Sequence, residues 1–403
     1  MITAKRHRMK ELCEITSSKR IFAADYQPEG IPFYRGKEIT EKHRGNLDVT
    51  TELFIDPEKF EAIRQKFGAP VAGDLLLTSV GTLGSPYVVR AGEEFYFKDG
   101  NLTWFRKLKG LDSKYLYYWL LSPWGRAELK KCTIGSSQSA YTIVLLKDME
   151  IDLPDLSTQR KIAGILSAYD DLIENNLRRI KILEEMAQSL YREWFVHFRF
   201  PGHESAKFVD SPLGQIPKGW EMKKLGELAD QMRRGVSKGE LDGPVRYVGL
   251  EHIPRQSLAL DAWEATTELG SNKLTFERGE VLFGKIRPYF HKVSVAPFNG
   301  ICSADTIVIR SKKPEHRALV TACVFTEAFV AHATATSNGS KMPRTDWKVL
   351  KDYPHVLPPK ELLARFSGLF VNAVAQQQNL VSRNQTLRRT RDLLLPKLLQ
   401  GQH

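Results

Sequence analysis

The sequence predicts a mixed α/β protein with two similar globular parts and two long helices. Short strand-like runs broken by Gly and Pro occur in both halves, matched residues recur at about half the length of 403, and two long segments carry heptad spacing. We expect an α+β fold with pseudo-twofold symmetry, in which two long helices separate the globular parts and pair as an antiparallel coiled coil. The expected parts, in turn globular, helical, globular and helical, are residues 1–154, 155–200, 201–358 and 359–403.

The internal repeat rests on matched residues that keep their order along the chain. Their separation is first 213, then 206 and finally 204 positions. The matches include Met9 with Met222, Leu12 with Leu225, Tyr34 with Tyr247, Gly73 with Gly279, Gly135-Ser136 with Gly339-Ser340, and Leu153-Pro154 with Leu357-Pro358. A nearly constant separation indicates duplication, so we expect both halves to fold alike.

Each globular part combines strands and helices. The runs DLLLTSV and PYVVR in the first half, and GEVLF and DTIVIR in the second, predict strands. Apolar spacing in residues 114–121 and 317–330 predicts helices.

Each long helical segment carries a stripe of core positions that are alternately four and three residues apart. This spacing is typical of a coiled-coil seam, with an ordinary amphipathic helix as the alternative. The first stripe is Ile162, Leu166, Tyr169, Ile173, Asn176, Ile180, Leu183, Ala187, Leu190 and Trp194. The second is Phe366, Phe370, Ala373, Gln377, Leu380, Asn384, Leu387, Arg391, Leu394 and Leu398. A buried amide such as Asn176 commonly fixes register, and at about 1.5 Å per residue the rod is roughly 60 Å long.

Charge and composition favour a nucleic-acid partner. The chain has 59 Lys and Arg against 47 Asp and Glu, a net charge of +12, which favours a polyanion, although a basic surface without such a partner is the alternative. No apolar run approaches the roughly 20 residues of a membrane span, the N-terminal residues lack a signal-peptide pattern, and the four cysteines lie far apart. We expect a cytoplasmic chain without membrane contact, disulfides or structural zinc.

No complete catalytic motif is found in the sequence. Residues 279–285 (GEVLFGK) have the Gly and Lys spacing of a phosphate-binding loop, but Ile286 stands where a metal-binding Ser or Thr is needed. The matching segment GDLLLTS lacks the second Gly and the Lys, so we expect a strand followed by a turn. A D-P-P-Y or N-P-P-F turn that would grip a flipped base is absent, and no histidines have metal-ligand spacing. These absences predict a non-catalytic chain that recognises something on which partners act.

Three stretches carry a recognisable pattern, namely LPDLSTQRKIAGILSAYDDLIENNLRRIKILEEMAQSLYREWFVHFRFPG, LLLPKLLQGQ and GQIPKGWEMKKLGEL. With them, the chain resembles the specificity subunits of type I restriction-modification systems over essentially its whole length. The specific marks are Gln159-Arg160-Lys161-Ile162 after the Leu-Pro entry, and the Trp194-Phe195 ending. Residues 361–365 (ELLAR) depart from the usual entry of the second helix, where one methyltransferase contact is expected.

This resemblance implies a DNA-binding subunit that serves DNA methylation and phage defence. Residues 1–154 and 201–358 would be target recognition domains, each reading one half of a bipartite, asymmetric site in double-stranded DNA. Two methyltransferase subunits would bind along the helices, and restriction or translocase subunits would join them. S-adenosylmethionine, ATP and Mg would belong to these partners, whereas this chain would hold no cofactor and no metal.

Polar and basic residues in Gly-rich turns are the candidates for DNA contact, because backbone there approaches phosphates and side chains reach base edges. In the first half these are Arg35, Lys37, Thr78, Ser79, Ser136, Ser137, Gln138 and Tyr141. In the second half they are Arg233, Arg234, Lys285, Arg287, Tyr289, His291, Lys292, Asn338, Ser340, Lys341 and Arg344. For each residue a solvated turn is the alternative, and Arg35 and Arg287 equally suit local salt bridges.

Three other functions stay open at this point. They are a specificity subunit of a related restriction system with other nuclease partners, an ATPase or nuclease that uses residues 279–285, and an RNA-binding scaffold, although the stacking signature of the usual RNA modules is missing. Neighbouring genes separate the first from the leading hypothesis. ATP binding that Lys285→Ala abolishes would favour the second, and competition between duplex DNA and RNA tests the third.

Inserting whole helical turns into both long helices is expected to widen the gap between the two half-sites without changing the bases read in either. The length of the rod sets the spacing of two readers on one duplex. Sequencing of methylated adenines in cells that carry each variant measures gap and half-sites together. A changed half-site with an unchanged gap would refute this role of the helices.

Overall fold

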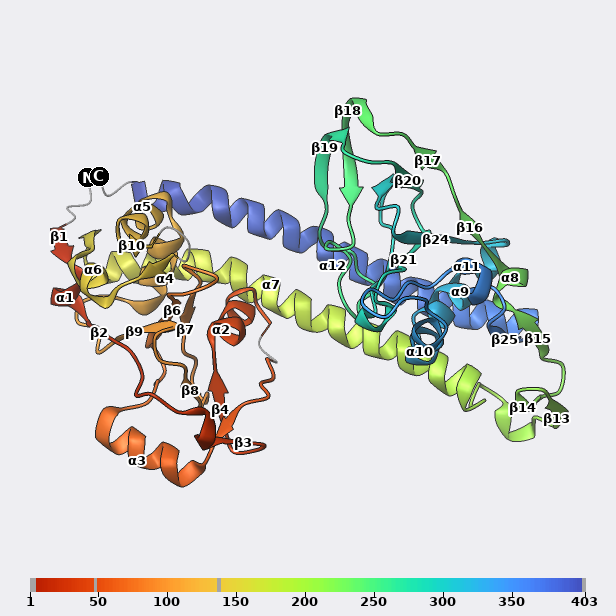
Figure 1. Cartoon of the computed structure of the whole chain (residues 1–403), viewed down its shortest axis with the longest axis horizontal. Helices are drawn as coiled ribbons and strands as arrows, with labels where there is room; N and C mark the ends of the chain where they lie inside the picture. The colour runs from red at the N-terminus through yellow and green to blue at the C-terminus, as the bar shows by residue number, and fades with distance from the viewer. Residues whose placement is uncertain (1–4, 47–48, 136–138, 401–403) are drawn as a thin grey trace. The chain divides into compact units, whose positions relative to one another are not determined.

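The computed structural model describes residues 5–46, 49–135 and 139–400 and has the expected mixed α/β class. The chain forms two compact units. Unit 1 consists of Met1–Glu174 and Thr386–His403, and unit 2 consists of Asn175–Gln385. Each unit contains one of the expected globular parts together with segments of both long helices (Figure 1).

The globular part of unit 1 is built from short strands and short helices. Its strands are β1 (Lys5–Arg8), β2 (Glu14–Thr16), β3 (Tyr26–Gln27), β4 (Ile31–Tyr34), β5 (Phe54–Ile55), β6 (Leu75–Thr78), β7 (Pro86–Val88), β8 (Tyr96–Phe97), β9 (Leu102–Arg106), β10 (Thr133–Ile134), β11 (Ala140–Tyr141) and β12 (Glu150–Leu153). Its helices are α1 (Met9–Leu12), α2 (Gly36–His43), α3 (Pro57–Phe67), α4 (Ser113–Leu121), α5 (Pro123–Lys131) and α6 (Ile143–Asp148). The described strands form sheets in the orders β2-β9-β6-β7 and β3-β5-β4-β8, with β1-β12 and β10-β11 as antiparallel pairs.

Local sequence explains where several of these elements begin and end. The side chain of Asp56 accepts a hydrogen bond from the backbone N–H of Lys59 (2.9 Å), Pro57 occupies the first turn of α3, and Gly68 ends that helix with φ 86°. All four residues of β6 are buried, and α4 packs against β7 on the same sheet (Figure 1).

Unit 2 repeats this plan. Its strands are β13 (Phe208–Ser211), β14 (Gly214–Pro217), β15 (Glu221–Lys224), β16 (Ala229–Met232), β17 (Gly235–Val236), β18 (Gly239–Val248), β19 (Glu264–Leu269), β20 (Lys273–Phe276), β21 (Val281–Gly284), β22 (Val293–Val295), β23 (Gly300–Cys302), β24 (Thr306–Ser311) and β25 (Pro354–Leu357). Its short helices are α8 (Leu225–Leu228), α9 (Arg317–Val324), α10 (Glu327–Ala335) and α11 (Trp347–Leu350). The described sheets have the orders β16-β24-β21-β22 and β17-β20-β23-β18-β19, besides the pairs β15-β25 and β13-β14.

The two units share the topology of one sheet and of one strand pair, as the internal repeat predicts, whereas their second sheets differ in strand number and order. The sheet β2-β9-β6-β7 corresponds to β16-β24-β21-β22, and the pair β1-β12 corresponds to β15-β25. The helices α5 and α10 begin and end exactly 204 positions apart. At the start of each half the separation is 216, because Lys5 pairs with Leu153 and Glu221 pairs with Leu357. The sequence match at 213 is therefore wrong there by three residues.

The second predicted helix of the globular parts, residues 317–330, is broken in the structure. It forms α9 and α10, with a turn between them at Phe325 and Thr326. The Thr326 hydroxyl accepts a hydrogen bond from the N–H of Phe329 (3.1 Å), and its own N–H donates to the Cys323 carbonyl (3.1 Å). A side-chain cap inside an apolar stretch starts a new helix without interrupting the apolar pattern, so periodicity alone missed it.

The two long helices are α7 (Leu156–Tyr191), which continues into a π-helical turn at Arg192–Val196, and α12 (Lys360–Gln400). Within unit 1, Ile162 and Leu166 of α7 belong to the same buried cluster as the C-terminal Leu399 of α12. Within unit 2, Ile180 of α7 belongs to one cluster with Leu380 of α12. Further along α7 in unit 2, Tyr191 lies against Phe366, which precedes Leu380 in α12, so the two helices are antiparallel there.

The burial of the predicted stripes differs between the two helices. Every member of the first stripe is buried or half-buried. In the second, Phe366, Phe370 and Leu380 are buried, and Leu387, Leu394 and Leu398 are half-buried. The deeper side chains at the end of α12 are Leu395 and Leu399, with 8% and 2% exposed. An α-helix has 3.6 residues per turn, so a strict heptad stripe drifts around the helix surface. At the end of α12 the most buried positions have therefore shifted by one residue, from Leu394 and Leu398 to Leu395 and Leu399.

Polar side chains interrupt the apolar contact between the helices. In unit 2 the Asn176 amide donates to the side-chain oxygen of Asn384 (2.8 Å), and both residues are buried. In unit 1 Asp170 accepts hydrogen bonds from Arg391 and from the hydroxyl of Tyr118. Buried polar groups must be paired to be tolerated, so these contacts restrict the helices to one register.

A loop of unit 2 is bound to both long helices. Glu184 of α7 is buried, and its carboxylate accepts hydrogen bonds from the Ser257 hydroxyl and from the Leu258 N–H (2.8 Å for the latter). Gln385 of α12 donates to the carbonyl of Asp261 (3.1 Å). Burial raises the pKa of Glu184 above its usual range, against the lowering effect of these hydrogen bonds.

Replacing Asn176 by Leu is expected to lower the free energy of unfolding by about 1–3 kcal/mol, because the Asn384 amide then loses its buried partner. Replacing both residues by Leu removes both polar groups, and a smaller loss is expected than for Asn176→Leu alone. Urea denaturation of the three proteins measures these differences. A double variant as unstable as the sum of the two single variants would contradict this account.

Replacing Glu184 by Gln is expected to stabilise the protein at pH 7, because a neutral amide avoids the burial of a charge and still accepts both hydrogen bonds. A raised folded-state pKa means that the stability of the unaltered protein falls as pH rises from the unfolded value, about 4.3, through the folded value. The difference in the free energy of unfolding between the variant and the unaltered protein is therefore expected to shrink at lower pH, where Glu184 is itself neutral. Denaturation at several pH values checks this, with the exposed Glu185→Gln on the same helix as control.

Candidate nucleic-acid interface

Two loops lie side by side in unit 2, and both contain predicted DNA-contacting residues. One is the hairpin loop between β21 and β22 and the other connects α10 with α11. The Lys285 carbonyl accepts from the Thr345 N–H (3.0 Å), and the Arg287 N–H donates to the Pro343 carbonyl (2.7 Å). We call residues 285–292 and 338–345 the paired loops of unit 2.

Unit 1 has the same arrangement at the same place in its topology. The hairpin loop between β6 and β7 lies beside the segment that carries β10 and β11, since Val80 forms a bridge with Ala140 and the Tyr141 N–H donates to the Ser79 carbonyl (3.0 Å). We call residues 79–85 and 133–141 the paired loops of unit 1. Three predicted residues of these loops, Ser136, Ser137 and Gln138, lie outside the described residues.

The paired loops of unit 2 expose a cluster of cations. Lys341 and Arg344 are exposed, and Lys285 and Arg287 are partly exposed. Asp305 is the acidic group beside them, with an oxygen 3.6 Å from the Lys285 ammonium and 3.8 Å from the Arg344 guanidinium. Asn338, Ser340 and Tyr289 are also exposed on these loops. Asp305 thus pairs with two of these four cations, and Lys341 and Arg344 remain exposed to solvent.

Other predicted residues are engaged inside their own unit. Thr78 and Ser79 are buried; the Thr78 hydroxyl accepts from the Ser85 N–H (2.9 Å), and the Ser79 hydroxyl bonds Thr103 (2.7 Å). His291 is buried and its Nε2 lies 2.9 Å from the Phe325 carbonyl. These three side chains position the loops, and we leave them out of the proposed DNA surface.

Several predicted cations have acidic or carbonyl partners. Arg35 pairs with the buried Glu38 (2.9 Å), as the salt-bridge alternative has it. Arg234 pairs with Glu277 and Glu280, and the Lys292 ammonium donates to the Leu250 carbonyl. Lys37 and Arg233 are exposed, and Tyr141 is half-buried beside Gly84.

Sequence reasoning missed three contributors to the surface of unit 2. The guanidinium of Arg255 lies 4.0 Å from the ring centroid of Phe290, and Arg255 is exposed. Met342 is exposed on the facing loop. Arg255 and Phe290 are 35 positions apart in the chain, so no local sequence pattern links them. Met342 is apolar, so a criterion of polar and basic residues in turns does not select it.

The segment that fits the spacing of a phosphate-binding loop is a strand and a turn. Its backbone donors are already used, because the Gly284 N–H donates to the Lys292 carbonyl (2.9 Å) and the Lys285 N–H to the Asp305 carbonyl (3.0 Å). The Lys285 ammonium donates to the Ala304 carbonyl (3.0 Å). A phosphate cradle needs free N–H groups that converge on the ligand, and this segment does not offer them.

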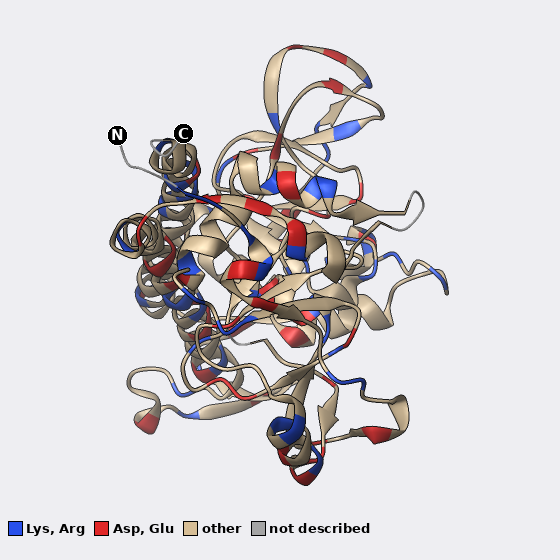
Figure 2. Cartoon of the chain, turned by 90° about the vertical axis from the view of Figure 1, so that its left-hand side faces the viewer, with Lys and Arg blue, Asp and Glu red and all other residues tan. Residues whose placement is uncertain are grey.

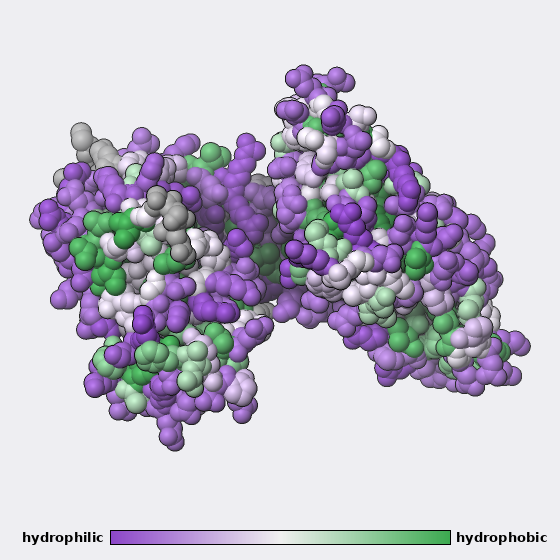
Figure 3. All heavy atoms as spheres, viewed as in Figure 1, coloured by the Kyte–Doolittle hydropathy of each residue, from purple (hydrophilic) through white to green (hydrophobic). Residues whose placement is uncertain are grey.

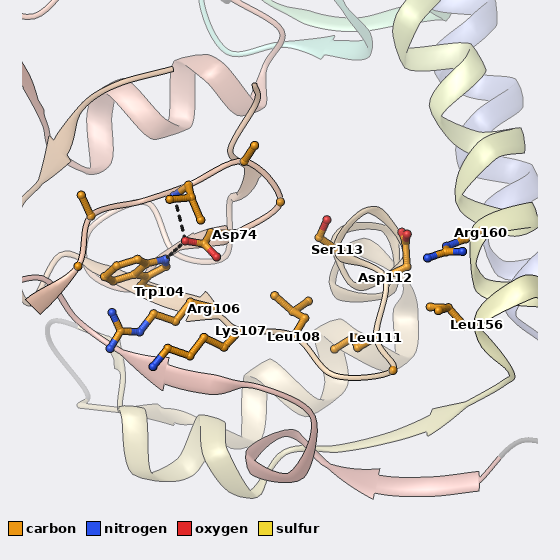
Figure 4. A pocket seen from close by; sticks show the side chains of 16 residues that line it. Asp74, Trp104, Arg106, Lys107, Leu108, Leu111, Asp112, Ser113, Leu156 and Arg160 are labelled. Carbon is orange, nitrogen blue, oxygen red and sulfur yellow. Dashed lines mark hydrogen bonds between the residues drawn. The ribbon is translucent and has the colours of Figure 1, made fainter. Parts of the chain in front are cut away.

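A pocket of about 620 Å³ lies in unit 1 between the sheet, the loop before α4 and the start of α7 (Figure 4). Asp74 accepts hydrogen bonds there from the Trp104 indole (2.8 Å) and the Val71 N–H (3.1 Å), and burial raises its pKa. Arg106 donates to the Phe67 carbonyl (2.9 Å) and to Glu14. These charged groups are paired with each other or with backbone, so we assign no chemistry to the pocket.

The views in Figures 2 and 3 show charged and hydrophobic residues without one dominant patch. In Figure 2, Lys and Arg alternate with Asp and Glu along the long helices and over the globular parts. The face in Figure 3 is mostly hydrophilic, with hydrophobic residues in small separate patches. The described residues contain no group of three or more His, Cys, Asp or Glu that could hold a metal ion.

None of the described helices is by itself long and apolar enough to cross a membrane. Only Pro314–Val324 and Glu327–Ala335, bent by 68°, reach that length and apolarity as a pair.

Comparison with known proteins shows similarity to DNA specificity proteins. Residues 1–185 match the family model described as type I restriction modification DNA specificity domain. The type I restriction enzyme MjaIX specificity subunit of Methanocaldococcus jannaschii is 27% identical over 344 residues, which cover 82% of this chain and 77% of the relative. The EcoDI specificity subunit of Escherichia coli is 27% identical over 317 residues, or 71% of this chain and 69% of the relative.

A solved structure has the same fold. The S subunit of a type I restriction-modification system from M. genitalium superposes with a TM-score of 0.60 at 16% sequence identity, over 98% of this chain and 96% of that one.

Proposed function

We propose that each of the two units of this chain binds one part of a split target in double-stranded DNA, since the chain is similar to type I restriction enzyme specificity subunits. The observation that carries the proposal is the presence of paired loops at the same topological place in both units. In unit 2 these loops carry five Lys or Arg, of which Lys292 donates to the Leu250 carbonyl and the other four are exposed or partly exposed, together with exposed polar side chains. Cations of this kind contact phosphates, and the neighbouring amide and hydroxyl groups reach base edges.

The two units differ in the side chains that their paired loops carry, which supports an asymmetric target. The hairpin loop of unit 1 (SVGTLGS) has no charged residue, whereas that of unit 2 (KIRPYFHK) has three Lys or Arg. Base readout depends on the donors and acceptors that a loop presents. Two loops so different in charge are expected to bind different half-sites with different dependence on salt.

We place the chemistry in partner subunits. In this chain the backbone donors of residues 284 and 285 are engaged, and the four cysteines are buried. Burial raises the pKa of Cys13, Cys302 and Cys323 to about 12, so these thiols stay protonated and weakly nucleophilic at neutral pH. Two methyltransferase subunits that bring S-adenosylmethionine, and restriction subunits that bring ATP and Mg, would dock on the chain, with the long helices as the proposed contact.

DNA affinity is expected to fall steeply with salt, because each phosphate contact releases counterions. Lys341→Ala and Arg344→Ala should each reduce the slope of log K against log salt by about one. Titration of a labelled random-sequence duplex with the complex of this chain and its methyltransferase measures the slope. Lys218→Ala, an exposed lysine outside the paired loops, is the control. Slopes equal to that of the control would place the DNA elsewhere on the chain.

A further inference from the structure

The turn at the tip of the unit 2 hairpin holds its backbone in a disfavoured conformation. Five described residues other than Gly have positive φ, namely Lys107, Phe198, Gln256, Arg287 and His291. Arg287 (48°) and His291 (49°) flank the 3₁₀ turn at Pro288–Phe290, and the Gln256 N–H donates to the His291 carbonyl (2.9 Å). Three of the five thus meet at one place. The left-handed region disfavours residues with a Cβ, so this turn is strained.

The same hairpin in unit 1 avoids the strain with glycine. Counted from the preceding strands, Gly81 with φ 79° corresponds to Arg287; counted from the following strands, Gly84 with φ 78° corresponds to His291. The Thr78 N–H donates to the Ser85 carbonyl in unit 1 as the Gly284 N–H donates to Lys292 in unit 2. The unit 2 loop is one residue longer, and it keeps side chains at two positions where Gly is free of strain. Strain of this kind is concentrated at functional sites.

The strained turn presents one aromatic side chain outward. Pro288 is buried, and Phe290 lies between the guanidinium groups of Arg255 (4.0 Å) and Arg287 (5.9 Å). The ring of Tyr289 lies 4.8 Å from that of Phe290 at 69°, and Tyr289 is 51% exposed. His291 anchors the turn on the Phe325 carbonyl. The turn is therefore held from within the unit, while the Tyr289 ring faces outward.

The surroundings of Tyr289 indicate what the ring meets. Arg255, Arg287, Lys341 and Arg344 lie on the loops that hold it or face it, with Asp305 as the acidic neighbour. An aromatic ring among cations is the arrangement that binds nucleic acid by stacking on a base while cations contact the flanking phosphates. A base in a duplex offers its face only where a step is opened, as it is when apolar side chains are inserted between base pairs.

We propose that Tyr289 is a stacking wedge, which inserts at one step of the half-site bound by unit 2 and distorts the duplex there. The proposal rests on the DNA-binding function inferred above. The corresponding loop of unit 1 has no aromatic residue among Val80, Thr82 and Leu83, so stacking by this hairpin is proposed for the half-site of unit 2 alone. Arg287 and His291 hold Tyr289 in position, and Tyr289 selects steps that open easily.

The test uses the complex of this chain with its methyltransferase and a pool of duplexes with a randomised centre. Bound duplexes are sequenced, and their unstacked thymines are detected with permanganate. The variants are Tyr289→Ala, Tyr289→Phe and Arg287→Gly. The matched control is Leu213→Ala, which removes a side chain of similar exposure outside the paired loops. Thermal unfolding of every variant monitors the fold.

The unaltered complex is expected to give reactive thymines in one half-site. Tyr289→Ala should weaken binding about tenfold, as for other stacking aromatics, and abolish the reactivity, whereas Tyr289→Phe and the control keep both. Arg287→Gly should keep the melting temperature and reduce the reactivity, because the relaxed turn no longer holds the ring.

Each other outcome overturns the wedge in a recognisable way. Unchanged binding and reactivity in Tyr289→Ala refutes it while DNA binding itself stands. Equal losses in the Ala and Phe variants assign Tyr289 a hydrogen bond through its hydroxyl instead of stacking. Failure of the unaltered complex to bind any duplex in the pool overturns the proposed function, and the wedge with it.

Discussion

Each long helix has to bury one apolar face, and both units depend on how that face is covered. In unit 1, Leu166 of α7 and Leu399 of α12 belong to the same buried cluster as Met9 and Phe105 of the globular part. In unit 2 the corresponding cluster joins the long helices to the sheet of β21 and to α9. In each unit one continuous cluster therefore joins part of the contact between the helices to the interior of the globular part. Loops that are anchored on such a core keep their position, which recognition of a fixed target requires.

Sequence pattern predicted those features that depend on burial. The stripe of the first long helix and the repeat of whole elements were found because a buried position restricts residue type at a regular interval. The seam at the end of α12 was placed one residue too early, at Leu394 and Leu398, because five leucines within seven positions fit more than one periodicity. The early match of Met9 with Met222 was misplaced for a related reason: identity of single residues does not define a register, whereas strand pairing does.

Residue type carried less information about the loops. Thr78 and Ser79 have the composition of an exposed turn, but their hydroxyls complete the hydrogen bonds of the hairpin from inside. A short hydroxyl side chain can form hydrogen bonds with water, with backbone or with a DNA base, and its place in the folded chain determines which of these partners it has. The stacking of Arg255 on Phe290 depends on two loops that meet only in the folded chain. The sequence around either residue does not predict this contact.

The two hairpin loops show how one repeated backbone arrangement carries two different sets of side chains. Both loops place left-handed residues at corresponding positions, and the backbone hydrogen bonds that close the hairpins are also shared. Glycine adopts this conformation freely, as at Gly81, whereas Arg287 adopts it only because the surrounding hydrogen bonds and the packing on α10 impose it. Since both glycine and larger residues occupy these left-handed positions in the two units, the side chain there can diverge while the hairpin is kept. Divergence at such positions changes what a unit binds without changing its fold, so two similar halves need not bind their half-sites with equal affinity or by the same contacts.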